Sequence, residues 1–280
     1  MINKTKDVDL KYYIYNDEIF TVEDFNTDII KKANSVYEVV RIMDGTPLFL
    51  EEHLDRLKKS IMLLNASYEP QVNKLIAQIL KLTQINSVIN HNIKIVVNEL
   101  HTKIPNVILF FIPSNYPSEI HYREGVKTIL FSTERTNPNA KVIMHQQREL
   151  LNNAIAEKKV YEAILVNTSG EITEGSRSNI FLVKNNSLYT APSKDVLEGI
   201  TRSRIIYLCN KIDVPVLECP IPVSFLDEID GLFITGTSPK ILPISSIDDK
   251  PFKSSENPVI YRLMSAYDQL ISDYIRSTII

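Results

Sequence analysis

The sequence predicts an α+β protein, with a small α/β domain at residues 1–113 and a larger, strand-rich domain at residues 125–280. The first half combines β-branched runs with two segments whose apolar residues recur every three or four positions, which is typical of strands packed on amphipathic helices. The second half holds many short strand patterns without a continuous αβ alternation, so a doubly wound sheet is not expected. Residues 114–124 show no apolar period and are expected to link the domains.

In the first domain, a helix is expected over residues 50–64, where leucine and isoleucine recur at steps of 4, 3, 4 and 3. A second helix is expected over residues 71–83 for the same reason. The run Val36–Met43 is β-branched and ends at Asp44-Gly45, a pair that favours a hairpin turn. Further strands are expected at residues 11–15, 92–98 and 107–112.

In the second domain, strands are expected at residues 127–132, 162–167, 180–183, 187–190, 214–218, 231–235 and 241–247. Helices are expected near residues 145–158, 201–212 and 257–276. Five of only seven glycines fall between residues 170 and 236. Because a scarce glycine usually marks a backbone requirement, the tight loops of a functional site are expected in that region.

Composition excludes several classes of protein. The 280 residues are 44% hydrophobic and carry a net charge of −3, so no basic field favours nucleic acid or a membrane surface. The longest apolar run, Val107–Ile112, is too short to span a bilayer, and the N-terminal residues lack the apolar core of a secretion signal. Cys209 and Cys219 have no metal-site spacing, which favours free thiols in the cytoplasm. The five histidines predict no zinc site.

The segment ITEGSRSNIF, residues 172–181, places a carboxylate, Glu174, in an expected glycine- and serine-rich loop. Upstream, Lys141 follows Asn139-Ala140 and precedes Glu174 by 33 residues. Downstream, Gly199-Ile200-Thr201 opens an expected helix, where free amides and the helix dipole favour an anion. A second Thr/Gly turn, residues 235–238, ends an expected strand. The stretch from Glu174 to Thr201 can therefore hold a charged ring and its phosphate.

In order and spacing, these segments resemble the class IV (fold type IV) enzymes that use pyridoxal 5'-phosphate (PLP). This family includes branched-chain aminotransferases, D-amino-acid aminotransferases and aminodeoxychorismate lyases. The resemblance implies a fold with a small N-terminal domain and a larger PLP-binding pseudo-barrel, and it covers residues 12 to 250 approximately. The first half adds VYEVVR at residues 36–41 and EHLDRL at residues 52–57.

The resemblance implies a role for each matching residue. Lys141 is the catalytic lysine that forms the Schiff base, and Glu174 pairs with the pyridine nitrogen, so that the ring can carry positive charge. Tyr37 faces the substrate. The remaining cofactor-binding residues are Arg56, Leu197, Gly199, Ile200, Thr201, Gly236, Thr237 and Ser238. Arg56 could instead pair with Glu52 one helical turn away, Thr201 could simply be a helix N-cap, and Tyr37 could be plain core.

Three departures from the family pattern concern the substrate. Ala33-Asn34-Ser35 replaces a G-D-G-like turn before Val36. The strand that ends at residues 98–101 lacks the arginine that many of these aminotransferases carry there, and His101 and Lys103 are the candidate replacements. Gln146 stands where branched-chain enzymes often have tyrosine.

The resemblance therefore implies an aminotransferase that moves an amino group between an α-amino acid and a 2-oxo acid, with PLP as cofactor, and that assembles as a homodimer. Aminodeoxychorismate lyase, which forms 4-aminobenzoate, is the first alternative because it would use the same lysine. A non-catalytic PLP-binding descendant is the second alternative, and the altered substrate region motivates it.

Overall fold

The computed structural model describes residues 7–32, 34–133, 138–143 and 145–278, and the chain divides into two compact units. Unit 1 comprises residues 1–115, 140–143 and 271–280, and unit 2 comprises residues 116–139 and 144–270. This division differs from the expected domain boundaries in two respects. The segment that carries Lys141 groups with unit 1, and so do residues 271–280 at the end of the chain.

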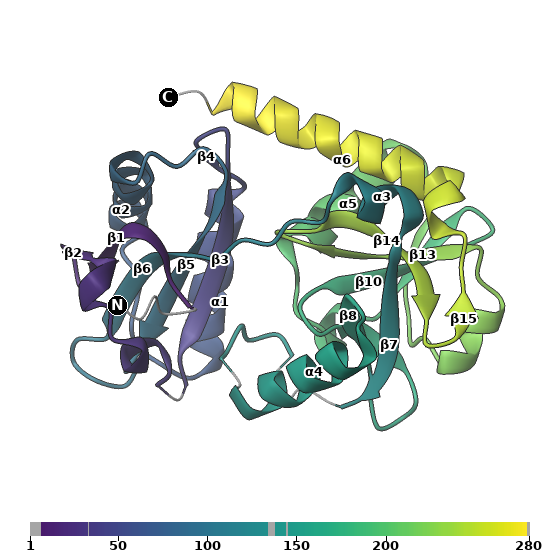
Figure 1. The fold of residues 1–280 in the computed structure, drawn as a ribbon, viewed down its shortest axis with the longest axis horizontal. Coiled ribbons are helices and arrows are strands. Elements are labelled where there is room, and N and C mark those ends of the chain that lie inside the picture. The colour runs from purple at the N-terminus through teal and green to yellow at the C-terminus, as the bar shows by residue number, and fades with distance from the viewer. Residues whose placement is uncertain (1–6, 33, 134–137, 144, 279–280) are drawn as a thin grey trace. The chain divides into compact units, whose positions relative to one another are not determined.

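An antiparallel sheet of six strands forms the centre of unit 1, in the order β2-β1-β6-β5-β3-β4 (Figure 1). The strands are β1 (Asp9–Tyr15), β2 (Glu18–Thr21), β3 (Val36–Met43), β4 (Thr46–Pro47), β5 (His91–Asn98) and β6 (Asn106–Ile112). Helices α1 (Leu50–Leu63) and α2 (Val72–Ile85) share an apolar cluster with one face of this sheet. Alternate residues of β3 face this cluster because strand side chains alternate between the two sides.

The opposite face of this sheet carries a second, aromatic cluster in unit 1. Phe25, between the short 3-10 helices η1 (Val22–Asp24) and η2 (Thr27–Ile30), packs on Tyr13 and Phe110, with ring centroids 4.8 and 5.2 Å away. Tyr37 of β3 lies at the edge of this cluster. Helices α1 and α2 thus cover one face of the sheet, and a cluster that includes aromatic side chains covers the other.

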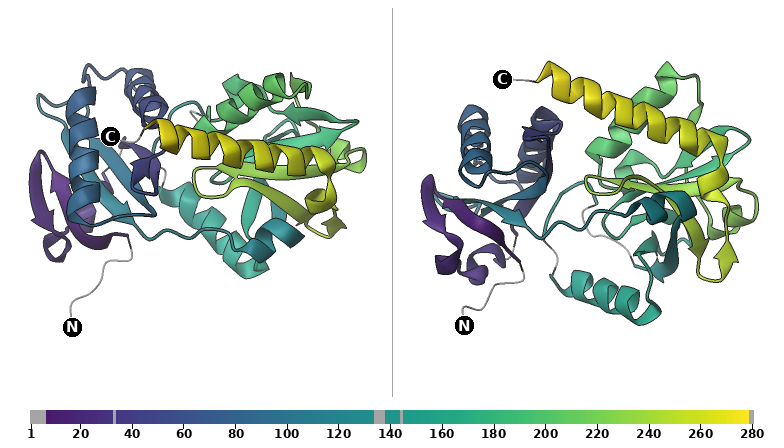
Figure 2. Two further views of the ribbon diagram at one scale, coloured as in Figure 1. Left: turned by 90° about the horizontal axis from the view of Figure 1, so that it is seen from above. Right: turned by 45° about the horizontal axis from the view of Figure 1, so that its top comes forward.

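The sheet of unit 2, coloured teal to yellow-green in Figure 2, has nine strands. Eight of them follow the order β12-β11-β10-β13-β14-β7-β8-β9, and β15 pairs with β14. Their bounds are β7 (Val126–Ser132), β8 (Glu162–Val166), β9 (Ile172–Gly175), β10 (Asn179–Lys184), β11 (Ser187–Thr190), β12 (Val216–Glu218), β13 (Gly231–Gly236), β14 (Lys240–Ile247) and β15 (Lys250–Pro251). The chain passes directly from β9 to β10, although these strands lie far apart in the order. The sheet is therefore curled.

The helices of unit 2 are α3 (Glu119–Glu124), α4 (His145–Lys158), α5 (Ile200–Lys211) and most of α6 (Pro258–Ser277), with the 3-10 turns η3 (Ser193–Asp195), η4 (Val223–Asp227) and η5 (Ser254–Glu256). One side of α6 is buried through Ile260, Leu263 and Tyr267, as the helical spacing of the sequence predicts. Among the described residues, no helix is long and apolar enough to cross a bilayer.

The long elements lie close to their expected positions, and so do the short strands β8, β10, β11 and β12, whereas other short elements were missed. Periodicity did not predict β2, β4, β15 or α3. Helix α3 lies within the expected linker and begins with a capping box between Ser118 and His121. The expectation that Glu174 lies in a loop is wrong, because it belongs to β9. An element of only a few residues offers few positions at which a hydrophobic period can be recognised.

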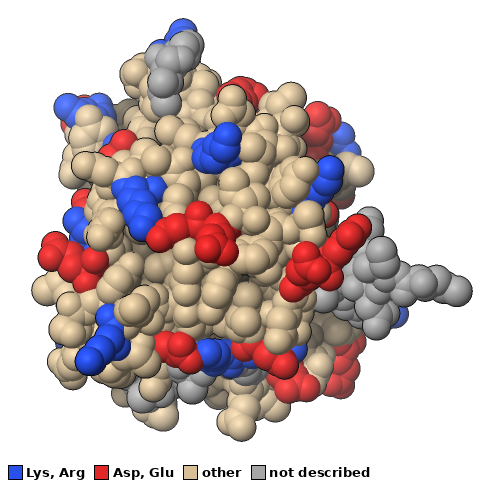
Figure 3. Space-filling view, turned by 90° about the vertical axis from the view of Figure 1, so that its left-hand side faces the viewer, with Lys and Arg blue, Asp and Glu red and all other residues tan. Residues whose placement is uncertain are grey.

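Figure 3 shows one face of the molecule, where lysine and arginine side chains lie interspersed with aspartate and glutamate. Both signs occur side by side, and uncharged atoms cover most of the face. The distribution on this face agrees with the near-neutral composition and does not form the basic surface that nucleic acids require.

Candidate functional site

Lys141 lies in the short segment of residues 140–143 in unit 1. Its carbonyl accepts a hydrogen bond from the Tyr37 amide (3.0 Å) at the start of β3. Its own amide donates to Ser60 Oγ on α1 (3.2 Å). The backbone of Lys141 is thus fixed by a strand on one side and a helix on the other, and its Nζ lies 5.0 Å from the centroid of the Tyr37 ring.

A second ammonium group lies near the same ring. Lys94 Nζ, on β5, is 4.9 Å from the Tyr37 centroid and 5.9 Å from that of Phe110. An aromatic face attracts a cation electrostatically, so the ring can hold each ammonium group nearby. The surroundings of Tyr37 are therefore positively charged and suited to an anionic group.

Arg56, Glu38 and His53 form a buried charge cluster in unit 1. Glu38 Oε1 accepts from Arg56 Nε (2.8 Å), and Glu38 Oε2 accepts from Arg56 Nη2 (2.7 Å). His53 Nδ1 lies 2.9 Å from Glu38 Oε2. The Glu38 side chain is fully buried, and the other two are at most 8% exposed. The alternative partner for Arg56 considered from the sequence was Glu52, and the sequence did not single out Glu38.

The protonation states of this cluster follow from its contacts. Burial would raise the pKa of Glu38, but the charge and hydrogen bonds of Arg56, with the hydrogen bond from His53, hold that pKa well below its usual range. Burial lowers the pKa of His53; Glu38 opposes this effect, and the charges of Arg56 and Lys141 reinforce it. Glu38 is therefore ionised and His53 neutral near pH 7. A carboxylate only accepts hydrogen bonds, so the proton of His53 lies on Nδ1.

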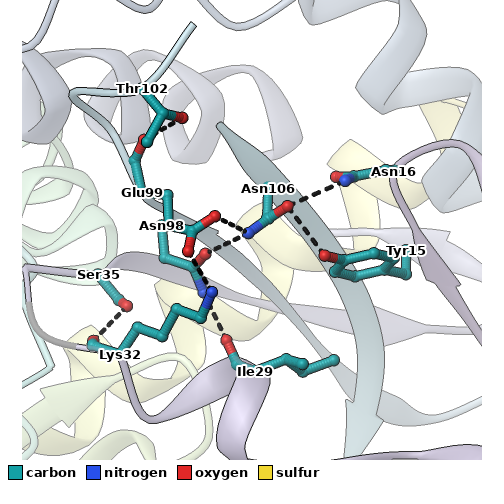
Figure 4. A network of polar contacts seen from close by, with 9 residues as sticks. All are labelled: Tyr15, Asn16, Ile29, Lys32, Ser35, Asn98, Glu99, Thr102 and Asn106. Atoms are coloured by element: carbon teal, nitrogen blue, oxygen red, sulfur yellow. Dashed lines mark hydrogen bonds and ion pairs between the residues drawn. The ribbon is translucent and has the colours of Figure 1, made fainter. Parts of the chain in front are cut away.

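The strand end that lacks the expected arginine carries a polar network instead (Figure 4). Glu99 pairs with Lys32 and accepts from Asn106 Nδ2 (2.6 Å). Asn106 Nδ2 also donates to Asn98 Oδ1 (3.1 Å), and Asn98 Nδ2 donates to the carbonyl of Ile29 (2.5 Å). The network ties the end of β5 to the segment that leads into β3. A carboxylate with a partner lysine thus occupies the place of the arginine.

The two candidate replacements for that arginine lie in the turn after β5. His101 and Lys103 are both exposed there. The turn that replaces the G-D-G-like sequence includes Ala33, which lies outside the described residues. Ser35 is buried, and its Oγ donates to the carbonyl of Lys32 (2.6 Å).

Glu174 lies in unit 2 on β9 and is 3% exposed. Its Oε2 accepts from the Leu197 amide (3.1 Å) and from Asn179 Nδ2 (3.4 Å). Asn179 Nδ2 also donates to the Leu197 carbonyl (2.8 Å). The carboxylate is therefore held by neutral donors, and Asn179 links it to the turn before α5.

Gly199 is the N-cap of α5, so the alternative reading of Thr201 as the N-cap is wrong. A Cβ at Gly199 would lie 2.1 Å from Asn179 Oδ1, so no larger residue fits beside Asn179 without rearrangement. The amides of Ile200 and Thr201 lie in the first turn of the helix, where backbone donors lack intrahelical partners and attract anions. Thr201 Oγ1 lies 3.4 Å from the hydroxyl of Tyr267.

Gly236 is the last residue of β13, and Thr237 and Ser238 begin the turn before β14. Asn179 pairs with Thr235 across β10 and β13, so this turn lies at the same end of the sheet as Asn179. A Cβ at Gly236 would lie 3.7 Å from the Arg177 carbonyl. Unit 2 thus brings Glu174 and both glycine turns together around the start of β10.

A second buried carboxylate, Glu162 on β8, supports the turn between β9 and β10. Its Oε1 accepts from the Arg177 amide (2.5 Å) and Ser176 Oγ (3.3 Å). Arg148 Nη1 donates to the Ser176 carbonyl (3.1 Å). Burial raises the pKa of Glu162, and the hydrogen bonds to it only partly oppose this effect.

Sequence reasoning missed Glu38, Asn179 and Glu162, although each left a signal. Glu38 is a charged residue on the apolar side of a strand, between Val36 and Val40, and such a position requires a buried partner. Asn179 lies within the quoted ITEGSRSNIF segment. Glu162 begins a strand whose five residues are all buried.

Comparisons with known proteins agree with this geometry. A putative branched-chain-amino-acid aminotransferase of Methanocaldococcus jannaschii is 29% identical over 237 residues, which are 80% of this chain and 82% of that protein. D-alanine aminotransferase of Bacillus licheniformis is 27% identical over 259 residues, 88% and 91% of the two chains. The branched-chain aminotransferase structure from Thermoproteus uzoniensis has a TM-score of 0.84 at 22% identity and covers 95% and 96% of the chains.

A putative 4-amino-4-deoxychorismate lyase from Legionella pneumophila has a TM-score of 0.79 at 22% identity, with 88% and 95% of the chains covered. These structural likenesses confirm the expected fold type IV architecture. The family described as amino-transferase class IV matches residues 35–247. This span is most of the chain and includes both groups of candidate residues, so the chain is an enzyme of the class IV aminotransferase family.

Proposed function

We propose that this enzyme is a PLP-dependent aminotransferase that transfers the amino group of an α-amino acid to a 2-oxo acid. The observation that carries the proposal is the fixed Glu174 carboxylate, held by the Leu197 amide and Asn179 beside the turn at the start of α5. A buried, oriented carboxylate next to an anion-binding helix terminus suits a cationic ring that bears a phosphate.

The residues fit the cofactor on three counts. Gly199 packs against Asn179 so closely that a Cβ would not fit, which keeps the first turn of α5 beside the residue that binds Glu174. Lys141 is held by its backbone while its amine stays beside Tyr37, as a covalent attachment point requires. Thr235 Oγ1 is buried and has no hydrogen-bond partner among the described residues. This hydroxyl at the end of β13 is therefore available to bind a polar group of the cofactor.

Each residue has a separate task in the proposed reaction. PLP, when bound, supplies an electron sink for the bond that breaks at the substrate α-carbon. Glu174 favours the protonated ring nitrogen because a carboxylate stabilises a nearby positive charge. Lys141 Nζ removes the α-proton as a general base and returns a proton to the cofactor C4' carbon as a general acid. Within unit 2, the first turn of α5 and residues 236–238 hold the phosphate.

The positive surroundings of Tyr37 support binding of the substrate carboxylate near Lys94. Lys94 takes this task more readily than His101 or Lys103, because its ammonium group lies beside the same ring as Lys141. Lys94→Gln is expected to raise KM for the amino acid with a smaller effect on kcat.

The decisive experiment records the visible spectrum of the protein with PLP, and then adds L-glutamate, L-isoleucine and D-alanine separately. We expect a yellow band that is absent in Lys141→Ala, and loss of that band with one of the donors. The responding donor gives the handedness of the substrate. The absence of any such band in the wild type would overturn the proposal.

Two other outcomes separate the alternatives. Release of pyruvate and 4-aminobenzoate from aminodeoxychorismate, with no response to amino donors, would identify a lyase. A stable yellow band that no donor and no aminodeoxychorismate alters would identify a non-catalytic PLP-binding protein. Assembly as a homodimer in the cytoplasm is part of the proposal. The unpaired thiols Cys209 and Cys219 suit a reducing compartment, and the mass in solution tests the dimer.

A further inference from the structure

Strand β3 brings two lysines to the same aromatic ring from its two edges. Along one edge it pairs with β5, where Lys94 is the diagonal cross-strand neighbour of Tyr37 on the same side of the sheet. Along the other edge it bridges to residues 140–143, and the Lys141 carbonyl accepts from the Tyr37 amide. Arg41, four residues along β3, adds a further cation on this side.

The distances to this ring bring the two ammonium groups close together. Lys94 Nζ and Lys141 Nζ lie 4.9 and 5.0 Å from the Tyr37 centroid, so the two nitrogens are at most about 10 Å apart. The ring attracts each cation and so offsets part of the repulsion between them. Both lysines are half-buried, and Lys94 also lies beside the fully buried ring of Phe110. Beside such apolar surface, water screens the repulsion less than in bulk solvent.

Two carboxylates on the neighbouring elements of unit 1 are paired with other cations. Glu38 faces the opposite side of β3 and binds Arg56 on α1 with both of its oxygens. Glu99, at the end of β5, pairs with Lys32. His53 on α1 is neutral near pH 7, because burial lowers its pKa. These groups therefore leave the positive charge around the Tyr37 ring in place.

We propose that Lys94 is a positioning residue that acts on Lys141 through its charge, and that it keeps the Lys141 amine deprotonated at a lower pH than an isolated lysine. A second ammonium group nearby disfavours the protonated form of a lysine. The neutral amine is the form that attacks an aldehyde or removes a proton. The inference rests on the proposed function, which gives Lys141 both tasks. A substrate carboxylate bound beside Lys94 would offset its charge and make Lys141 a stronger base.

The test measures the reactivity of Lys141 against pH in the full-length protein freed of PLP. The protein is treated with a limiting amount of acetic anhydride at each pH, and acetylation of each lysine is determined by peptide mass spectrometry. Only the neutral amine reacts, so the midpoint of the curve reports deprotonation, and the plateau at high pH reports access. We expect the midpoint for Lys141 to lie below that for Lys158, an exposed lysine in the last turn of α4.

Three variants separate charge from packing. Lys94→Gln removes the charge and should lower acetylation of Lys141 at pH 8 by about three- to tenfold, with an unchanged plateau, as expected for one elementary charge at this distance. Lys94→Arg keeps the charge and should keep the wild-type curve. Lys81→Gln removes an exposed lysine of α2 and should also keep it. Added sodium chloride should raise the midpoint more in the wild type than in Lys94→Gln, because salt screens the repulsion. If Lys94→Gln does not fold, Lys94→Met should show the same loss.

The contrary results are distinct. If the midpoint for Lys141 is the same in the wild type and in Lys94→Gln, or Lys94→Met in its place, the charge of Lys94 does not reach the amine and the inference fails. If Lys94→Arg shifts the midpoint as far as Lys94→Gln, the effect comes from packing and the inference also fails. The cofactor takes no part in these measurements. A yellow band with PLP but an unshifted midpoint would therefore overturn the inference alone, and a shifted midpoint without such a band would overturn the proposed function alone.

Discussion

The two units hold their buried carboxylates in opposite ways. Glu38 in unit 1 is paired with the guanidinium of Arg56 and with His53. Glu162 in unit 2 is equally buried but accepts from a backbone amide and a serine hydroxyl. The pKa of Glu38 is accordingly lowered, and that of Glu162 is raised. Burial raises the pKa of both carboxylates. The groups around each carboxylate therefore decide whether its charged form is stabilised.

The same contrast extends to the candidate site residues. In unit 1, Lys141, Arg56 and Lys94 lie in a set of charges and an aromatic ring. In unit 2, Glu174 and the turn at Gly199 are held by neutral hydrogen bonds and close packing around Asn179. Substitutions of the candidate site residues should therefore act through charge in unit 1 and through shape at Gly199 in unit 2.

The largest difference is expected when each buried carboxylate is removed. Glu38→Ala leaves the buried Arg56 without its counter-charge and should lower the free energy of unfolding by about 3–5 kcal/mol. Glu162→Ala leaves only neutral donors unpaired and should lower it by about 1–3 kcal/mol. Urea unfolding at pH 7 measures both, with Asp55→Ala as an exposed control. Equal losses for the two variants would remove the distinction between charged and neutral donors.

The sequence predicted the long elements and the glycine turns well, for a physical reason. One side is buried in helices α1, α2 and α6 and in strand β3. Burial of one side places apolar residues at a regular spacing, which can be recognised directly in the sequence. The turns at Gly199 and Gly236 combine residues whose backbone properties are local. Lys141 and Glu174 were singled out through a resemblance to a family, because nothing in their neighbours alone distinguishes them, and their roles stay predictions.

The partners of these residues could not be predicted in the same way. That Glu38 binds Arg56 depends on how β3 packs against α1, and that Asn179 reaches Leu197 depends on the curl of the sheet. Glu174 was assigned to a loop because β9 has only four residues. Lys141 groups with unit 1 through contacts with Tyr37 and Ser60, which are remote in sequence.

A change of shape in unit 2 should have the next largest effect. In Gly199→Ala, the new methyl group would meet Asn179 Oδ1, and the rearrangement should lower the free energy of unfolding by about 1–3 kcal/mol and weaken PLP binding. Gly236→Ala is the matched control, because its nearest neighbour would be Pro239 Cδ at an ordinary 3.4 Å. A Gly199→Ala protein as stable as Gly236→Ala would show that close packing does not hold this turn.

A smaller effect, with a distinctive pH dependence, is expected at Glu162. Because its folded pKa is raised, its contribution to stability is present below the usual value of 4.5 and is lost as the pH rises through the folded pKa. Glu162→Gln keeps an acceptor oxygen without the charge, so it should change stability at pH 7 by less than about 1 kcal/mol. The free energy of unfolding of Glu162→Gln should increase relative to that of the wild type as the pH rises from 4.5. If the free energies of unfolding of the wild type and of Glu162→Gln changed with pH in the same way, this result would contradict the raised pKa.

The smallest expected effect is the pH dependence of His53, and it runs in the opposite direction. The pKa of His53 is lowered by burial, so its contribution is present above the usual value of 6.5 and is lost as the pH falls below it. His53→Asn keeps a donor for Glu38 but cannot titrate, so stability should fall less steeply below pH 6.5 than in the wild type. His101→Asn removes an exposed histidine and should follow the wild-type curve. If His53→Asn and His101→Asn lose stability at the same rate on acidification, His53 is not held neutral, and the charge cluster of unit 1 responds to pH through Glu38 alone.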